Sequence, residues 1–400
     1  MKKVFFILSC ILIGAGIIFG GIFYWKNLRG IGPVVFPPPD KIESKLPPAQ
    51  NNTEFPLKLP DGFSISIFAK DLPGARVMKL DDSGNMWVSQ TSQGKITRLM
   101  IRDGKVINQT PVLINLKKPH GFAFDPEDPR VLYYAEENQV SRIRPDHNTK
   151  PDKLVDLPSG KGHFTRTLGF GPDGRLYISI GSSCNVCQEQ DERRAKIYSI
   201  NKDGSDFKEF ARGLRNAVFF TWHPKTQKMW ATEMGRDELG ADIPPDEIDI
   251  VEQGKDYGWP ICYGKNIHDT DFDKNTYIRN PCMEPFEIPP HIDIPAHSAP
   301  LGLAFIPATE SWPKEYWHDL LVAYHGSWNR SAPTGYKIVR FELDENGKYE
   351  GQEDFITGWL TEDNRALGRP VDILVQPDGV MYISDDKAGV IYKVAYRKNK

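Results

Sequence analysis

A short pattern of polar turn residues and alternating apolar residues recurs along the chain. Each copy is a turn rich in Asp, Pro and Gly followed by aromatic and β-branched residues, as in GPDGRLYIS at 171–179 and QPDGVMYIS at 376–384. A turn followed by apolar alternation with a period of two predicts a β-strand. Further copies lie at 81–89, 125–135, 223–232 and 312–323.

Each copy is preceded by a second apolar run. These runs read ARVMKL, HGFAF, RTLGF, NAVFF, PLGLAF and RPVDILV. The strand–turn–strand unit therefore occurs six times, spaced by about 45–50 residues in the first half, which is typical of a propeller blade. The pattern predicts an all-β fold, a six-bladed β-propeller.

The two ends of the repeat region predict how the ring closes. The last strand, VIYKVAY at 390–396, has no sequential partner, and FSISIFA at 63–69 precedes the first unit. We expect these two strands to pair, because closure removes the open edges of the sheets. A seventh blade hidden in the insert at 254–296 is the alternative, but that insert lacks the strand–turn–strand pattern.

The N-terminus differs in character from the repeats. Residues 4–25 form an uncharged, mainly apolar run, and about 20 residues suffice to span a bilayer. Lysines 2 and 3 precede the run and favour an N-terminus inside the cell. We expect a membrane anchor at 1–26, with a cleaved signal segment as the alternative. A Pro-rich tether at 27–57 then leads to the propeller domain at 58–400, outside the cytoplasm in both cases, in the periplasm or beyond the cell.

Composition narrows the function classes. The chain has 400 residues, 26% of them charged, and a formal net charge of −3, which gives no sign of a nucleic-acid surface. Of the five cysteines, Cys184 and Cys187 form C-N-V-C, and Cys262 and Cys282 flank part of the insert. In an exported protein we expect the disulfides Cys184–Cys187 and Cys262–Cys282. A redox motif or half of a zinc site is the alternative for C-N-V-C.

Polar residues cluster just before the first strand of several units. In a propeller the first strand of each blade lines the central channel, so these residues share one mouth. Most are cationic or neutral hydrogen-bond donors, which predicts a ligand rich in carboxylate or carbonyl oxygens. A structural hydrogen-bonding role is the alternative for any one of them. The residues are His120, His163, Arg166, Arg215, Asn216, His297 and Arg369.

Two further segments carry candidate chemistry. The segment 232–260 is expected to be a flexible loop that concentrates acidic residues, among them positions 237, 238, 242, 246, 247 and 249, and hard oxygen ligands on such a loop suit calcium. A solvated acidic loop is the alternative. The segment HGSWNRSAPTGYK at 325–337 is Gly- and Pro-containing, follows an expected strand, and is a candidate pocket rim. Its polar and aromatic residues are His325, Trp328, Asn329, Arg330 and Lys337.

Several of these segments together resemble one enzyme family. GHFTRTLGFGPDGRLYISIGSSCNVC, GLRNAVFFTWHP, PPDEIDIVEQGKDYGWP, HGSWNRSAPTGYK and GRPVDILVQPDG are similar to the soluble PQQ-dependent sugar dehydrogenases, in particular the sorbosone and aldose sugar dehydrogenases. The resemblance covers residues 58–397. It implies a six-bladed propeller, pyrroloquinoline quinone (PQQ) and calcium as cofactors, an aldose or related sugar as substrate, and an unidentified electron acceptor.

The resemblance also implies roles for particular residues. His163 matches the general base, Arg215 and Asn216 match the cofactor-binding pair, and Arg369 matches an arginine of the last blade. The calcium loop falls at Gly235, Arg236 and Asp237, while Lys337 and Arg330 are both candidates for the cofactor lysine. The substrate pocket would then include His120, Arg166, His297 and Trp328.

The implied reaction is a sugar oxidation. His163 would take the hydroxyl proton while hydride passes to the quinone. This chain departs from the family pattern in having a single arginine, Arg369, before Asp372. Two other functions remain as alternatives: a calcium-dependent lactonase, and a membrane-tethered propeller that binds a ligand without catalysis.

Overall fold

The structure is a computed structural model that describes residues 14, 16–22, 46–145, 150–285 and 287–397. It divides into two compact units, Met1–Lys45 and Leu46–Lys400. The expected anchor lies mostly outside the described residues. Within them, residues 16–22 are helical, and no described helix combines the length and the apolar character needed to cross a bilayer.

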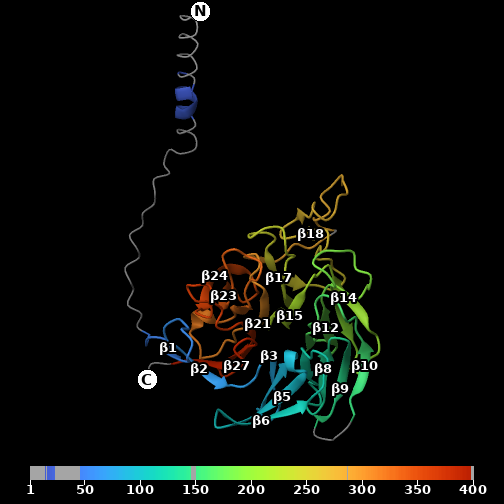
Figure 1. The fold of residues 1–400 in the computed structure, drawn as a ribbon, viewed down its shortest axis with the longest axis vertical. Helices are drawn as coiled ribbons and strands as arrows, with labels where there is room; N and C mark the ends of the chain where they lie inside the picture. Colours follow the sequence, from blue (N-terminus) through green and yellow to red (C-terminus); the bar gives the residue numbers. More distant parts are fainter. Residues whose placement is uncertain (1–13, 15, 23–45, 146–149, 286, 398–400) are drawn as a thin grey trace, which may run out of the picture. The chain divides into compact units, whose positions relative to one another are not determined.

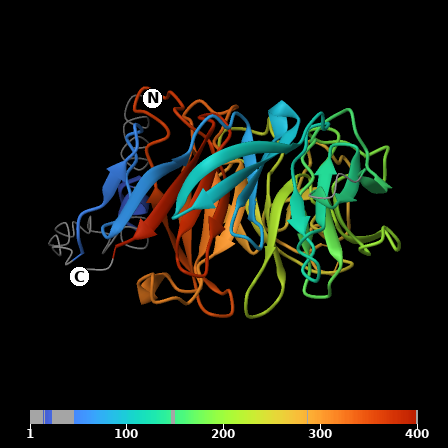
Figure 2. The same cartoon turned by 90° about the horizontal axis from the view of Figure 1, so that it is seen from below.

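The second unit is built from six antiparallel sheets that radiate from a common centre (Figures 1 and 2). The first three blades consist of β3 (Ala75–Leu80), β4 (Met86–Gln90), β5 (Lys95–Arg102) and β6 (Lys105–Leu113); β7 (Phe122–Phe124), β8 (Leu132–Glu136), β9 (Gln139–Ile143) and β10 (Asp152–Asp156); and β11 (Leu168–Phe170), β12 (Leu176–Ile180), β13 (Lys196–Ile200) and β14 (Lys208–Arg212).

The remaining blades complete the ring. They consist of β15 (Ala217–Trp222), β16 (Met229–Glu233), β17 (Asp246–Val251) and β20 (Ile292–Ile294); β21 (Pro300–Phe305), β22 (Leu320–Tyr324), β23 (Lys337–Leu343) and β24 (Tyr349–Ile356); and β25 (Pro370–Val375), β26 (Met381–Asp385), β27 (Val390–Tyr396), β2 (Phe63–Ala69) and β1 (Gln50–Asn52). The expected six-bladed propeller is confirmed, with the repeated units on the first two strands of each blade.

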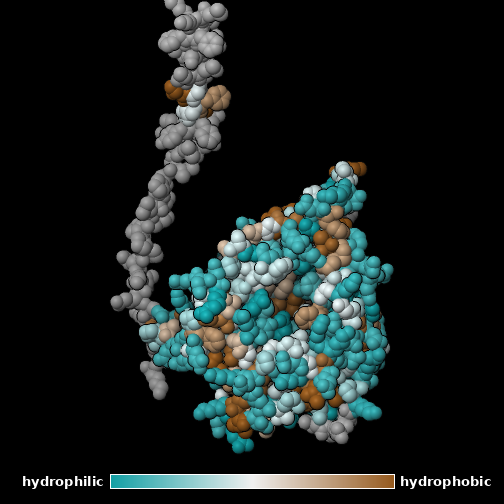
Figure 3. Space-filling view, in the orientation of Figure 1, coloured by the Kyte–Doolittle hydropathy of each residue, from teal (hydrophilic) through white to brown (hydrophobic). Residues whose placement is uncertain are grey.

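The insert between β17 and β20 does not form a seventh blade. In the described residues it contains one small ladder, β18 (Cys262–Tyr263) with β19 (Ile267–His268), and β20 returns as the outer strand of blade 4. The insert projects from the blade in Figure 1, and its end carries apolar surface in Figure 3. Ile278 and Met283 are among its exposed apolar residues.

The first and last strands close the ring as expected. β2 pairs antiparallel with β27, from Phe63 opposite Tyr396 onward. β1 adds a parallel strand beyond β2, and Leu57 is buried in the adjoining core. The compact unit thus begins at Leu46, within the stretch expected to be a tether.

An aromatic residue of the repeat joins each early blade to the next. Trp87 of β4 packs edge-on against Phe124 of β7 with ring centroids 5.5 Å apart, and Trp230 of β16 packs against Phe305 of β21 at 5.4 Å. The pairs Tyr133–Phe170 and Tyr177–Trp222 repeat the arrangement at the two interfaces between them. These contacts bury large rings between the sheets and explain why the repeat carries an aromatic residue.

In three blades, a serine hydroxyl near the end of the second strand accepts a backbone N–H group that has no partner in the β-ladder. The register shifts near the start of β3, β15, β21 and β25, so these inner strands leave the ladder at their first residues. The Oγ atoms of Ser89, Ser179 and Ser384 accept the N–H groups of residues 77, 167 and 372 at 3.0–3.2 Å. The starts of β3, β11 and β25 are therefore satisfied without a ladder partner, and they lie beside polar residues of one channel mouth.

Closure of the ring can be tested at Phe63. Its ring is fully buried and makes edge contacts with Trp312, Tyr316, Phe355 and Tyr396. We expect Phe63→Ala to lower the free energy of unfolding by about 3–5 kcal/mol, because it leaves a cavity between blades 5 and 6.

Denaturant unfolding of the variant and of Ile107→Ala gives the comparison. Ile107 lies on β6 and is half exposed, so its truncation should change the unfolding free energy by less than about 0.5 kcal/mol. Equal effects of the two substitutions would contradict the closure described here.

Candidate functional site

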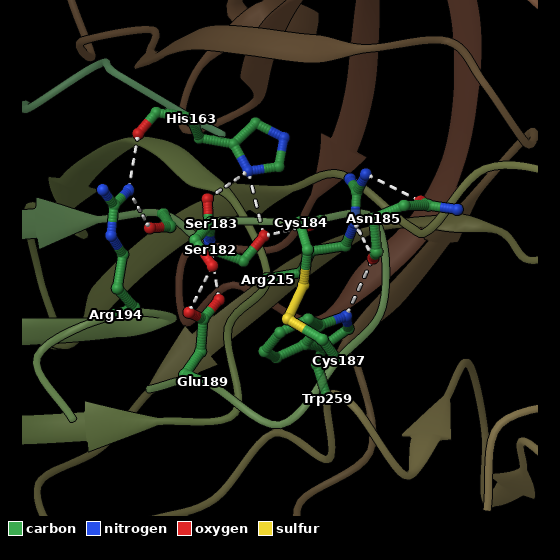
Figure 4. Close-up of a disulfide and its surroundings, with 11 residues drawn as sticks. His163, Ser182, Ser183, Cys184, Asn185, Cys187, Glu189, Arg194, Arg215 and Trp259 are labelled. Atoms are coloured by element: carbon green, nitrogen blue, oxygen red, sulfur yellow. Dashed lines mark hydrogen bonds between the residues drawn. A yellow bond between two sulfur atoms is a disulfide. The ribbon is translucent and has the colours of Figure 1, made fainter. Parts of the chain in front are cut away.

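His163 lies in the loop before β11 and is fixed by Ser182. Its backbone N–H donates to the Ser182 carbonyl at 2.9 Å, and its Nδ1 lies 3.1 Å from that carbonyl and 3.0 Å from the Ser182 hydroxyl. The Ser182 hydroxyl itself donates to the Cys184 carbonyl at 2.7 Å, so it can only accept from Nδ1 (Figure 4). The hydrogen therefore sits on Nδ1, and Nε2 carries the free lone pair.

The surroundings keep this imidazole neutral. Burial, with the nearby charges of Arg215 and Arg166, lowers the pKa of His163 to about 3, against the opposing effect of the hydrogen bond that Nδ1 donates to the Ser182 carbonyl. A neutral ring with an unprotonated Nε2 is the form that can accept a proton from a ligand.

A cavity of about 170 Å³ opens in front of His163. It gathers side chains from blades 1, 3, 4 and 5, and none of its lining residues is a carboxylate. The polar ones are Arg76, His163, Thr165, Asn216 and His325, and the apolar ones include Phe164, Val218, Met234 and Leu301. The structure thus brings His163 and Asn216 together at one mouth of the channel, as the sequence predicts.

Arg76 and His325 share a carboxylate at this cavity. Asp386 accepts from Arg76 Nη1 at 2.7 Å and from His325 Nε2 at 2.9 Å. Burial opposes ionisation of Asp386, but the hydrogen bond from His325 and the charge of Arg76 hold its pKa at about 2. The Nε of Arg76 is buried without a protein partner, so this guanidinium retains a donor for a ligand.

Arg215 and Asn216 follow one another before β15 but face different groups. The Arg215 guanidinium donates to the carbonyls of Asn185 at 2.8 Å and Gly235 at 2.9 Å, and it lies 3.4 Å from an Asp237 carboxylate oxygen. The side chain of Asn216 lines the cavity. Gly181 permits this packing, because a Cβ there would lie 2.6 Å from the Asn216 amide oxygen.

Two expected pocket residues serve the surrounding framework. Arg166 is fully buried and donates to the carbonyls of His163, Thr165 and Pro158 at 2.7–2.9 Å, so it fixes the loop that carries His163. His120 is also fully buried, with Nδ1 3.3 Å from the Thr167 hydroxyl, and its Nε2 has no partner. Neither side chain lines the 170 Å³ cavity.

Arg369 and Lys337 were both expected to bind the cofactor. Arg369 donates to the carbonyls of His325 at 2.9 Å and Gly326 at 2.6 Å, and thereby holds the loop that carries His325. Lys337 is on β23 and pairs with Asp354 of β24 at 2.5 Å, so the structure does not bring it to the cavity.

The other predicted rim residues lie around the loop after β16. His297 Nε2 lies 2.7 Å from the Gly240 carbonyl, and Arg330 pairs with Asp242 at 2.6 Å. Trp328 is 74% exposed. His297 and Arg330 thus contact this loop, and none of the three residues lines the cavity in front of His163.

The expected calcium loop lies next to a smaller cavity of about 20 Å³. Gly235 and Arg236 line it, while Asp237 accepts from Asn329 Nδ2 at 2.6 Å. The Gly235 carbonyl already accepts from Arg215, and Arg236 pairs with Asp269 at 3.2 Å.

The acidic segment does not form a single loop. Asp246, Glu247 and Asp249 belong to β17 and are buried, because this half of the segment continues the sheet of blade 4. Glu247 stands opposite Glu233 of β16 on one side and Asp293 of β20 on the other. The prediction of one flexible acidic loop over 232–260 is therefore wrong for these three residues.

Several carboxyl oxygens in and near blade 4 have no hydrogen-bond donor among the described residues. Glu233 Oε2, both Asp249 carboxyl oxygens and Glu287 Oε2 are buried with no hydrogen-bond donor. Burial raises the pKa values of Glu233, Glu247 and Asp249 well above their usual range, and raises that of Glu287 to about 8. Glu233 and Glu247 line the small cavity together with Arg215 and Arg236, so its wall offers carboxyl oxygens that a cation could use beside two guanidinium groups.

Both expected disulfides are present, Cys184–Cys187 beside His163 and Cys262–Cys282 in the insert. Three residues of the site were not predicted from the sequence: Arg76, Ser182 and Asp386. Arg76 had a signal, since it stands at the start of the first inner strand, where other blades carry polar residues. Ser182 and Asp386 had none, because their roles arise from contacts between loops.

Comparisons with known proteins agree with this architecture. An uncharacterized protein of Borreliella burgdorferi is 32% identical over 86% of this chain and 91% of its own length. A pyrroloquinoline quinone-dependent pyranose dehydrogenase of Coprinopsis cinerea is 24% identical over 86% of this chain, which spans 55% of that enzyme. A calcium structure of a Trichoderma reesei family AA12 carbohydrate-active enzyme superposes with a TM-score of 0.73 at 20% identity, covering 87% of this chain and 100% of the other.

A family model described as TrAA12-like matches residues 57–397, which is nearly the whole propeller. The chain therefore belongs to the TrAA12-like family, which is related to the PQQ-dependent sugar dehydrogenases.

Proposed function

We propose that the protein is an exported oxidoreductase that oxidises an aldose or related sugar with PQQ and calcium. The observation that carries the proposal is the cavity in which the free Nε2 of a neutral His163 faces the same space as Arg76, Asn216 and His325. The kinship with PQQ-dependent sugar dehydrogenases supports the same reaction class.

The residues of the cavity fit a planar ligand that carries carboxylate and quinone oxygens. Arg76 has an unpartnered buried Nε, and the Asn216 amide contacts only the Met234 sulfur, at 3.3 Å, so both retain donors. We propose that these two residues bind the cofactor and that Arg215 and Arg369 hold the loops around it. When bound, the ortho-quinone would accept a hydride from the sugar.

His163 would act on the sugar hydroxyl. Its Nε2 would take the proton, while Nδ1–H remains bonded to the Ser182 carbonyl and hydroxyl, which stabilise the positive charge that develops on the ring. A bound ligand that displaces water from the cavity would strengthen these interactions. A lactonase that holds its metal with carboxylates in the cavity in front of His163 is disfavoured, because none of the residues that line this cavity is a carboxylate.

We propose that calcium is held beside Gly235 by the buried carboxylates. The unpartnered Glu233 Oε2 and the Glu247 side chain at the 20 Å³ cavity supply the hard oxygen donors that calcium takes. When bound, the ion would supply two positive charges that offset these acids. The two disulfides support a location outside the cytoplasm.

The reaction is tested with the full chain incubated with PQQ and calcium. We expect aldose-dependent reduction of a redox dye, and we expect His163→Ala to lower the turnover number by about 10²–10⁴-fold while the quinone still binds. His318→Ala, outside the cavity, serves as the control and should keep full activity. A wild-type protein that neither reduces dye nor shows a PQQ-dependent rise in melting temperature would contradict the proposal.

The protonation state of His163 can be measured in the ligand-free protein. With a pKa of about 3, the ring should stay neutral with its hydrogen on Nδ1 from pH 8 down to about pH 4. Because the unfolded ring binds a proton near pH 6.5, its contribution to stability should decrease as pH falls below that value. Long-range ¹H–¹⁵N NMR reports both properties. A titration between pH 6 and 7, or a hydrogen on Nε2, would overturn this assignment.

Arg76 provides a test of the cofactor position. We expect Arg76→Ala to raise the PQQ dissociation constant by at least about tenfold, because a charge-assisted hydrogen bond is lost. Arg212→Ala, on the exposed outer strand β14, should leave the constant unchanged. Absorbance titration gives both values. Equal PQQ affinities in the two variants would mean that Arg76 pairs with Asp386 and does not bind the cofactor.

A further inference from the structure

The loop closed by Cys184 and Cys187 lies between His163 and Arg215 (Figure 4). None of its residues belongs to a β-strand, and its side chains are partly exposed. We propose that Asn185 is a positioning residue for Arg215 and that the Cys184–Cys187 disulfide holds Asn185 in place. The expected effect of Asn185 on PQQ affinity rests on the proposed function, in which Arg215 borders the PQQ site.

Asn185 joins three segments that are distant in sequence. Its carbonyl accepts from Arg215 Nε at 2.8 Å and from Trp259 Nε1 at 3.3 Å. Its side-chain oxygen accepts from Arg215 Nη2 at 3.0 Å and from the Asp237 N–H at 2.7 Å. Its amide donates to the Asp237 carbonyl at 3.0 Å.

These contacts fix the direction of the Arg215 guanidinium. Asn185 supplies two of its acceptors, one from the backbone and one from the side chain, on adjacent nitrogens of the planar group. A planar guanidinium held at two nitrogens in this way has one orientation, and the Gly235 carbonyl accepts from its third nitrogen, Nη1. The Arg215 side chain is only 5% exposed as a result.

The disulfide is the covalent link that closes the loop on itself, beside the carboxylate of Glu189, which accepts from the N–H and the hydroxyl of Ser183 at 2.6 Å. Without the disulfide, residues 184–187 would be held by hydrogen bonds only, against the conformational entropy of a short irregular segment. The loop is also linked to His163 through Ser182, because the Cys184 carbonyl accepts from the Ser182 hydroxyl, which in turn accepts from His163 Nδ1. Opening the disulfide should therefore disturb Arg215 first and His163 second.

A dithiol reductant can open this link by thiol–disulfide exchange. The reductant's two thiols become a disulfide, and Cys184 and Cys187 gain two electrons and two protons as free thiols. Both cysteines are partly exposed, whereas Cys262 and Cys282 are buried. Mild reduction should thus open the first disulfide before the second.

The test is arginine labelling of the ligand-free full chain with phenylglyoxal, followed by peptide mass spectrometry. We expect Arg215 to react at least about tenfold faster in Asn185→Ala, in Cys184→Ser/Cys187→Ser and after mild reduction than in the untreated protein. Arg166, which is fully buried, should stay unlabelled, and Arg212, which is half exposed, should react equally in all samples. Cys262→Ser/Cys282→Ser is the matched control and should leave Arg215 protected.

Protection of Arg215 in all three altered proteins would overturn the proposal. Labelling of Arg166 together with Arg215 would also overturn it, because the loop would then support the whole blade and not one side chain. A parallel PQQ titration should show a dissociation constant raised about tenfold in Asn185→Ala. If the wild-type chain binds no PQQ, the proposed function fails, and the labelling result still decides the role of Asn185.

Discussion

A backbone N–H group that leaves a β-ladder inside a protein needs another acceptor, and the site depends on how this chain provides one. Four of the inner strands begin with a shift in register, and at two of them the hydroxyls of Ser89 and Ser384 on the neighbouring strand accept the released N–H groups. The first residues of these strands can then turn toward the channel mouth. Arg76 and Asn216 reach the cavity from two such strand starts, and His163 reaches it from the loop before β11.

The two cavities at the mouth offer different chemical groups. Arg76 and the rings of His163 and His325, whose pKa values burial lowers, line the larger cavity. The carboxyl groups of Glu233 and Glu247 line the smaller one together with Arg215 and Arg236, and Met234 borders both cavities. This arrangement suits the proposed pair of ligands, because the larger cavity offers hydrogen-bond donors to an anionic cofactor and the smaller one offers carboxyl oxygens to a divalent cation.

The sequence predicted the fold more completely than the site, for a physical reason. The repeat carries its own signal, a turn followed by alternating aromatic and β-branched residues, so the blades and the β2–β27 closure followed from local pattern. The polar residues before the inner strands indicated His163 and Asn216, the family resemblance implied their roles, and the structure places both at one cavity. The positions of Arg166 and Lys337 did not follow, because a sequence does not show whether a cation meets protein carbonyls, a carboxylate or open space.

The central claim is that the cavity bounded by Arg76, His163, Asn216 and His325 is a cofactor site. A crystal structure of the chain grown with PQQ and calcium tests it most directly. The account predicts electron density for the quinone between these four side chains, with His163 Nε2 directed toward the space left for the sugar. Quinone density elsewhere on the propeller, with this cavity empty, would contradict it.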